Sequence, residues 1–290
     1  MQPPLATRLM GLDALRGIAV ALTFTMHYAW LYGNLFLGKD LETTSLRAAA
    51  GAEESWAQLS YYSLYGVYFF FMISGMLIGR TWIGTNKRNM LSFLRYRAWR
   101  IFPAFWAALA GYFVLTSWRG TTLPNQLPDI VANGLLVNWF APHIYPPWLI
   151  VSWSLQVECI FYLVMPVVGM ILGLTTGAVR VWVLLILALG VAVCLKGLGE
   201  RHFAYPLYFA VGIAAANQPT ETRRWAHALP LMPLATTLAA LHIAYAWWAP
   251  IGALKPSWEF TPFDAFAGLF AVIGGLIFVR LAYAPPSWLL

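Results

Sequence analysis

Residues 11–30 read GLDALRGIAVALTFTMHYAW. This stretch is mostly apolar over about 20 residues, the length that an α-helix needs to cross the hydrocarbon core of a bilayer. It nevertheless contains Asp13, Arg16 and His27. A charged side chain in the middle of a lipid-facing helix costs roughly 2.5–3.5 kcal/mol, so such residues usually face protein, a ligand or water. The stretch therefore predicts a membrane helix that carries a functional face.

The whole chain has the composition of a membrane protein. It is 60% hydrophobic and 10% charged, whereas soluble domains are about 25% charged. Backbone groups in hydrocarbon must find partners within their own helix, and the alternation of barrel strands is missing, so we expect an all-α polytopic fold. We expect a single integral-membrane domain over residues 1–290. Windows of about 19 residues predict about eight transmembrane helices, near residues 15–37, 61–82, 101–118, 148–174, 179–195, 203–217, 229–249 and 265–284.

The basic residues set the expected orientation. Most of the 18 Lys and Arg residues fall on one side of the predicted helices, and the positive-inside rule makes that side and the N-terminus cytoplasmic. The net charge of +7 is explained by this topology. We expect no nucleic-acid partner, because the basic residues form no single stripe with interleaved aromatic residues. The first helix is expected to be an uncleaved anchor.

Arg16 and His27 are 11 residues apart. On an α-helix this spacing is three turns plus about 20°, so both side chains project from one face, about 16 Å apart along the axis. This geometry suits a long anionic ligand whose phosphates bind Arg and whose reactive end reaches His. The alternative is that Arg16 is a topological charge and His27 is an interfacial or hydrogen-bonded core residue.

A second polar face lies in the predicted fourth helix, which contains WSLQVECIFYLVMP. Ser154 and Glu158 share one face of this helix, and Glu158 lies inside an apolar run. A carboxylate in that position needs a partner. His27 or one of the arginines could supply it, either as a catalytic pair or as a structural ion pair, and the local sequence leaves both possibilities open.

The predicted second and third helices carry further candidates. Residues 80–100 are basic and are expected to form a cytoplasmic loop, with Pro103 where the third helix begins or kinks. Arg97 and Arg100 are expected to share a face at its mouth, where they could bind phosphates or extend to lipid headgroups. Ser74 and Gly75 lie in an aromatic-rich helix and are interpreted as packing residues that could line a pocket.

An external stretch, NWFAPHIYPPW at residues 138–148, is rich in aromatic residues. Trp139, Tyr145 and Trp148 could stack on a sugar, but residues of this kind are enriched at any membrane interface, and we prefer that interpretation. The remaining histidines lack metal-ligand spacing, so no metal is expected.

Four motifs in order resemble acyltransferase family 3, the integral-membrane acyltransferases of bacterial glycans and related substrates. The most specific is a Leu-Asp-x-Leu-Arg-Gly run followed by His, with ten residues between Arg and His. The resemblance covers about residues 8–166. The matching residues are Leu12, Asp13, Leu15, Arg16, Gly17 and His27; Phe70, Phe71, Ser74 and Gly75; Arg97, Arg100, Ile101 and Pro103; and Trp153, Ser154, Leu155, Glu158, Phe161 and Tyr162.

This resemblance implies transfer of an acyl group, most simply acetyl from acetyl-CoA, to a hydroxyl of a sugar, polysaccharide or lipid-linked glycan at the bacterial inner membrane. His27 would be the general base or would itself be acylated, and Glu158 would orient or stabilise its imidazole. The phosphates of acyl-CoA would bind Arg16, Arg97 and Arg100. The substrate-binding residues would be Asp13, Ser74, Trp153 and Ser154.

One feature departs from the family pattern. Members usually continue with a Leu-Gly-x-x-Ser-Tyr-x-x-Tyr-Leu segment, whereas this chain stops at PPSWLL, so we expect the family's last helical segment to be missing. The competing function is a transporter or flippase that uses the intramembrane Arg, His and Glu as an ion or proton path. A weaker alternative is a membrane scaffold without catalytic activity.

Overall fold

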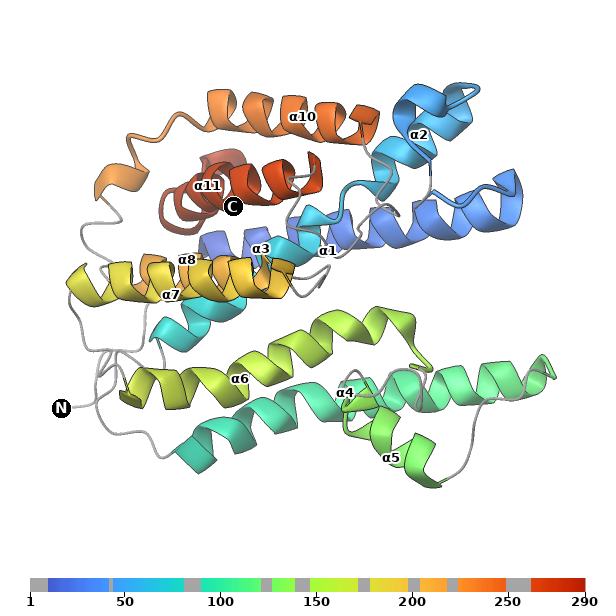
Figure 1. The fold of residues 1–290 in the computed structure, drawn as a ribbon, viewed down its shortest axis with the longest axis horizontal. Helices are drawn as coiled ribbons and strands as arrows, with labels where there is room; N and C mark the ends of the chain where they lie inside the picture. The colour runs from blue at the N-terminus through green and yellow to red at the C-terminus, as the bar shows by residue number, and fades with distance from the viewer. Residues whose placement is uncertain are drawn as a thin grey trace. The chain divides into compact units, whose positions relative to one another are not determined.

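The computed structural model describes residues 10–41, 44–80, 90–120, 127–138, 147–171, 178–197, 204–217, 224–248 and 262–289. These residues form helices and no strands, joined by turns and short loops (Figure 1). The prediction of an all-α fold is confirmed.

A helix lies at each of the eight predicted positions. Among the described residues, three segments are long and apolar enough to cross a membrane: Ala52–Ile78, Met90–Trp118 and Asp264–Tyr283. Trp153–Val168 and Tyr205–Ala216 are apolar but shorter. The membrane class is therefore supported, and eight crossings stay a prediction. The helices at the eight positions are α1 (Met10–Tyr32), α3 (Tyr65–Ile78), α4 (Met90–Trp118), α6 (Trp153–Ile171), α7 (Ala178–Gly197), α8 (Tyr205–Asn217), α10 (Leu231–Trp248) and α11 (Pro262–Tyr283).

The chain divides into two compact units, which are described separately. Unit 1 comprises residues 1–84 and 175–290, and unit 2 comprises residues 85–174. Unit 1 therefore contains α1, α3, α7, α8, α10 and α11, and unit 2 contains α4 and α6. The prediction of a single membrane domain stays a prediction.

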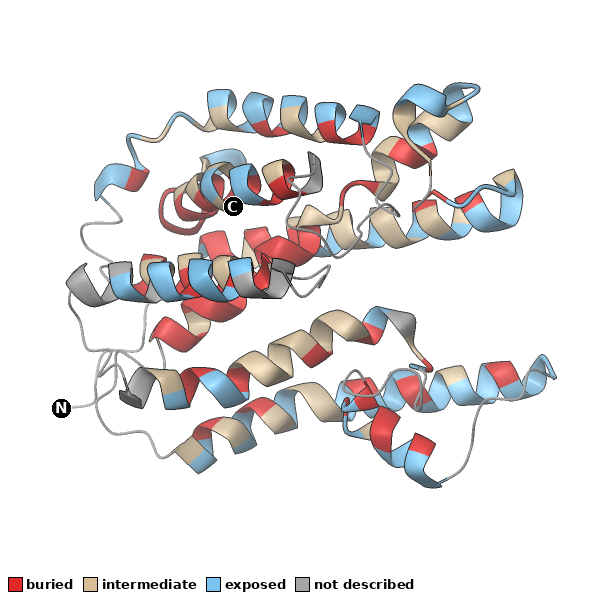
Figure 2. Cartoon of the chain, in the orientation of Figure 1, coloured by how far each residue is buried: buried red, intermediate tan, exposed pale blue. Residues whose placement is uncertain are grey.

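In unit 1, α3 is the most buried helix, and Figure 2 shows it in red along much of its length. It packs against α8 through small residues. A Cβ atom added to Gly75 would lie 2.1 Å from the carbonyl oxygen of Phe209, and one added to Gly212 would lie 2.0 Å from that of Met72. Only glycine allows two helices to approach so closely, which is a common way to pack helices in membranes.

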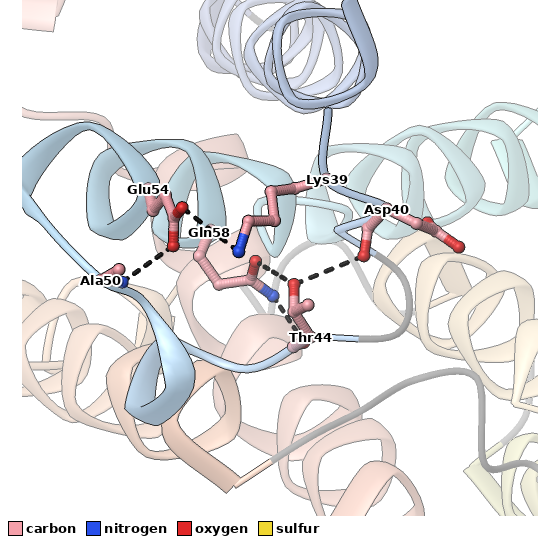
Figure 3. Close-up of polar contacts among 6 residues, drawn as sticks. All are labelled: Lys39, Asp40, Thr44, Ala50, Glu54 and Gln58. Atoms are coloured by element: carbon pink, nitrogen blue, oxygen red, sulfur yellow. Dashed lines mark hydrogen bonds and ion pairs between the residues drawn. The ribbon is translucent and has the colours of Figure 1, made fainter. Parts of the chain in front are cut away.

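The segment that follows α1 contains a further helix, α2 (Ala52–Tyr61). Gln58 of this helix is buried and donates hydrogen bonds to the carbonyl oxygens of Leu41 (3.1 Å) and Thr44 (2.7 Å). Thr44 returns a bond from its hydroxyl to the Gln58 side-chain oxygen (Figure 3). Lys39 and Glu54 form an ion pair at 3.4 Å. These contacts hold the segment that follows α1 against α2.

In unit 2, the prediction that residues 80–100 form a loop is wrong for residues 90–100. Helix α4 begins at Met90 and continues to Trp118, with Pro103 inside it. Pro103 therefore does not begin the helix. A proline removes one backbone hydrogen bond, and membrane helices tolerate this loss where neighbouring groups pair the freed carbonyl.

Trp148 also differs from its predicted place. It is 7% exposed and belongs to a buried cluster with Phe105, Leu109 and Leu136. Its backbone N–H donates a 2.8 Å hydrogen bond to Asn133 of the short helix α5 (Leu127–Gly134). The sugar-stacking possibility for Trp148 is therefore wrong, because its ring is covered by the core of unit 2, and its place at the membrane interface stays a prediction. Trp139 and Tyr145 lie outside the described residues.

Candidate active site

His27 lies on α1 in unit 1, and its imidazole is half-buried. Its Nδ1 atom is 2.8 Å from the carbonyl oxygen of Thr23, one turn earlier. A carbonyl oxygen can only accept a hydrogen bond, so the Nδ1 atom must carry the proton and donate it. In the neutral ring this assigns the lone pair to Nε2. The local helix therefore prepares Nε2 as a base or nucleophile.

Arg16 and Asp13 lie on the same helix and pair with each other. The Nη1 atom of Arg16 donates a 2.8 Å hydrogen bond to the Asp13 carboxylate, and both side chains are about one-third exposed, at 33% and 36%. The helix is continuous from Met10 to Tyr32, so the predicted separation of about 16 Å between Arg16 and His27 along one face holds. The contact gives Asp13 a definite partner, which orients the guanidinium group.

Ser74 is buried at 7% exposure inside α3. The next residue, Gly75, is the point of close approach to α8. These observations agree with the packing interpretation of this motif. A role for Ser74 in substrate binding stays a prediction.

In unit 2, the two arginines of α4 have different environments. Arg97 is 5% exposed, and its guanidinium carbon lies 4.8 Å from the ring centre of Tyr162 and 5.4 Å from that of Phe93. Arg100 is exposed. Residues three apart on a helix differ by about 60°, and Arg97 contacts Tyr162 of α6 whereas Arg100 is exposed. A role for both arginines in phosphate binding stays a prediction.

Glu158 of α6 has a partner within unit 2. The hydroxyl of Tyr162 donates a short hydrogen bond to the Glu158 carboxylate. The same hydroxyl accepts a 3.4 Å hydrogen bond from Nη1 of Arg97. Arg97, Tyr162 and Glu158 therefore form a continuous polar chain. The sequence predicts His27 or an arginine as the partner of Glu158. In the structure, Arg97 is connected to Glu158 through the hydroxyl of Tyr162.

The start of α6 holds Trp153 and Ser154, both half-buried. The Ser154 hydroxyl lies at the limit of hydrogen bonding, 3.5 Å, from the carbonyl oxygen of Val151. Their predicted place in an acceptor site stays a prediction. His27 belongs to unit 1 and Glu158 to unit 2, so the predicted pairing of these two residues also stays a prediction.

Sequence reasoning did not assign a role to two residues that contact the candidate site. Tyr162 was part of a motif, and its position four residues after Glu158 could have indicated the contact, because side chains at i and i+4 meet on a helix. Thr23 contributes through its backbone carbonyl. Thr23 is four residues before His27, and this spacing could have indicated the hydrogen bond in the same way.

The comparisons with known proteins agree with this arrangement of motifs. A protein-family model described as an acyltransferase domain matches residues 10–290. A curated protein of Komagataeibacter xylinus named "Putative membrane-bound transacylase BcsY" is 25% identical over 296 residues, which cover 96% of this chain. The chain spans 60% of the length of that relative. No solved structure matches the chain.

Proposed function

Since the chain belongs to acyltransferase family 3, a family of acyl-transferring membrane enzymes, we propose that it moves an acyl group from a cytoplasmic acyl-CoA to a hydroxyl group. The proposed donor is acetyl-CoA, and the proposed acceptor is a sugar, polysaccharide or lipid-linked glycan. The proposed location is the bacterial inner membrane, with the N-terminus in the cytoplasm. The basic residues support this orientation, because the positive-inside rule assigns the side with most Lys and Arg to the cytoplasm, where acyl-CoA is present.

The observation that carries the proposal is the hydrogen bond from His27 to Thr23. With the proton held on Nδ1, the Nε2 atom can accept the proton of an acceptor hydroxyl. The hydroxyl oxygen then attacks the thioester carbonyl, the carbon–sulfur bond breaks, and the leaving thiolate takes the proton from Nε2. In the alternative route, Nε2 attacks the thioester and expels the CoA thiolate; the hydroxyl oxygen then attacks the acyl-imidazole, Nε2 leaves, and the thiolate takes the hydroxyl proton. Both routes require the Nε2 lone pair.

Arg16 supports the binding of the donor. A guanidinium group offers several fixed N–H donors and can bind Asp13 and a phosphate at the same time. Its separation from His27 leaves room for an extended pantetheine arm between the phosphates and the thioester. Arg100 is exposed on α4 and is proposed as a further phosphate ligand.

Arg97 is better suited to a different role from the predicted one. Its guanidinium group is buried between two rings and bonded to Tyr162. We therefore assign Arg97 to positioning Tyr162 and Glu158, with Glu158 supplying a negative charge to the reaction.

The proposal is tested with the full chain reconstituted in liposomes and given acetyl-CoA labelled in the acetyl group. Release of free CoA and transfer of label to added glycans are measured for the wild type and for His27→Gln. We expect the variant to lose at least about 100-fold in rate, the typical contribution of a general acid–base group. His227→Gln is the control, because His227 is exposed and has no assigned role. Proton-coupled flux without thioester cleavage would overturn the proposal and favour the transporter.

A further inference from the structure

Several helix ends of unit 1 meet at one end, which we call the inner end. It comprises the start of α1, residue Arg80 after α3, and the last turns of α8 and α11. A Cβ added to Gly11 would lie 2.0 Å from the carbonyl oxygen of Leu281, and the Tyr283 hydroxyl donates a 2.8 Å hydrogen bond to Ala215. The distribution of basic residues makes this end cytoplasmic.

Two arginines at the inner end have no role in the proposed function so far. The Nε atom of Arg280 donates a 3.2 Å hydrogen bond to the carbonyl oxygen of Leu229, which fixes the guanidinium group. Its Nη1 atom is buried and has no hydrogen-bond partner among the described residues. A Cβ added to Gly79, the residue before Arg80, would lie 2.7 Å from the Cβ of Ala216 on α8, and Tyr283 of α11 bonds to the neighbouring Ala215. Arg80, which follows α3, and Arg280, in the last turn of α11, therefore both lie at the inner end.

Carboxylates do not balance these charges in the described part of unit 1. Asp13 is the carboxylate at the inner end, and it bonds to Arg16. The remaining carboxylates of that part lie toward the opposite ends of the helices: Asp40, Glu53, Glu54 and Asp264. A buried guanidinium N–H without an acceptor is costly. The inner end is therefore suited to an anion that brings several oxygen atoms.

Measured along the axis of α1, Arg280 of α11 comes first, then Arg16 and then His27. Gly11 contacts α11 next to Arg280, and Arg16 is five residues further, about 7.5 Å deeper by the rise of an α-helix. His27 lies about 16 Å beyond Arg16. Acyl-CoA has the same order of groups: a phosphate on the ribose, a diphosphate, and then the thioester at the end of a long arm. The diphosphate would lie at Arg16.

We propose that Arg80 and Arg280 bind the ribose 3′-phosphate of the acyl-CoA donor. This inference rests on the proposed function and adds to it a second phosphate site, which would select CoA over its dephosphorylated form. A phosphomonoester offers three oxygen atoms to two guanidinium groups, and charge-assisted hydrogen bonds of this kind are the stronger ones. The alternative is that Arg280 only caps Leu229 and that Arg80 binds a lipid phosphate.

The test compares the Kd for CoA with the Kd for dephospho-CoA, which lacks the 3′-phosphate, by calorimetry on the full chain in a non-ionic detergent. For the wild type we expect CoA to bind about tenfold more tightly, the effect of one good charge-assisted contact. Arg80→Gln and Arg280→Gln should each weaken CoA binding and leave dephospho-CoA binding unchanged. Arg47→Gln, an exposed arginine in the segment before α2, should change neither value.

Three outcomes would contradict the 3′-phosphate site or the proposed function, each in a different way. Equal binding of CoA and dephospho-CoA by the wild type would overturn the 3′-phosphate site and leave the proposed function intact. No binding of CoA at all would count against the proposed function itself. If phosphatidylglycerol added to the detergent displaced CoA from the wild type but not from Arg80→Gln, the site would be a lipid site. If Arg280→Gln does not fold, the 3′-phosphate site is still tested by the ratio of the two Kd values for the wild type and by the Kd for CoA of Arg80→Gln.

Discussion

The hydroxyl of Tyr162 donates a hydrogen bond to the carboxylate of Glu158, one turn earlier on α6. Because the same hydroxyl accepts a bond from Arg97, a cation on α4 and an anion on α6 are joined through one oxygen atom. Paired in this way, both charges can remain in the apolar interior of unit 2, where an isolated charge would be costly.

Tyr162→Phe tests this relationship. The variant keeps the ring that packs against Arg97 but removes the hydroxyl that joins the two charges. We expect the free energy of unfolding to fall by about 2 kcal/mol, since the buried Arg97 and the half-buried Glu158 each lose a partner, and acyl transfer to slow. Thermal unfolding in detergent and CoA release measure the two effects. Tyr96→Phe, at an exposed position of α4, is the control; equal stability of the two variants would contradict the prediction.

Arg97→Lys should not be a conservative change. Lysine keeps the charge but loses the flat surface that lies between the rings of Phe93 and Tyr162. We expect a loss of about 1–2 kcal/mol in stability. The matched variant is Arg95→Lys on the same helix, where the side chain is exposed and the expected change is within about 0.5 kcal/mol. A wild-type unfolding temperature for Arg97→Lys would show that stacking contributes little.

Arg16→Lys should weaken CoA binding about tenfold, because an ammonium group cannot hold Asp13 and a phosphate with the same fixed geometry. The unfolding temperature should hardly change, since an ion pair that is about one-third exposed contributes less than about 1 kcal/mol. Calorimetric titration with CoA measures the affinity. Unchanged affinity would remove Arg16 from the phosphate site.

Gly75→Ala should separate α3 from α8. The added Cβ would lie 2.1 Å from the carbonyl oxygen of Phe209, which is too close for any contact, so the helices must shift at a cost of about 2 kcal/mol or more. Gly190→Ala on α7 is the control, because nothing lies within 4 Å of its added Cβ. That variant should be as stable as the wild type or more stable by up to about 1 kcal/mol. The unfolding temperatures of both variants in detergent decide the comparison.

Gln58→Leu should release the segment between α1 and α2. The carbonyl oxygens of Leu41 and Thr44 would each lose a side-chain donor, and we expect faster hydrogen exchange and proteolysis over residues 44–51. Glu53→Gln, at an exposed position of the same helix, should leave both rates unchanged. Unchanged protection in Gln58→Leu would mean that the ion pair between Lys39 and Glu54 is sufficient to hold the segment.

The sequence by itself determined the helical class and the places of the eight helices, because hydropathy and backbone pairing in a membrane act over one segment at a time. It also determined the separation of Arg16 and His27, since that distance depends only on the pitch of one helix. Only the tertiary structure decided that Arg97 is buried while Arg100 is exposed, that Trp148 belongs to a core, and that Tyr162 joins Arg97 to Glu158. Each of these depends on which other segment packs against a given face, and the pattern of a single helix does not contain that information.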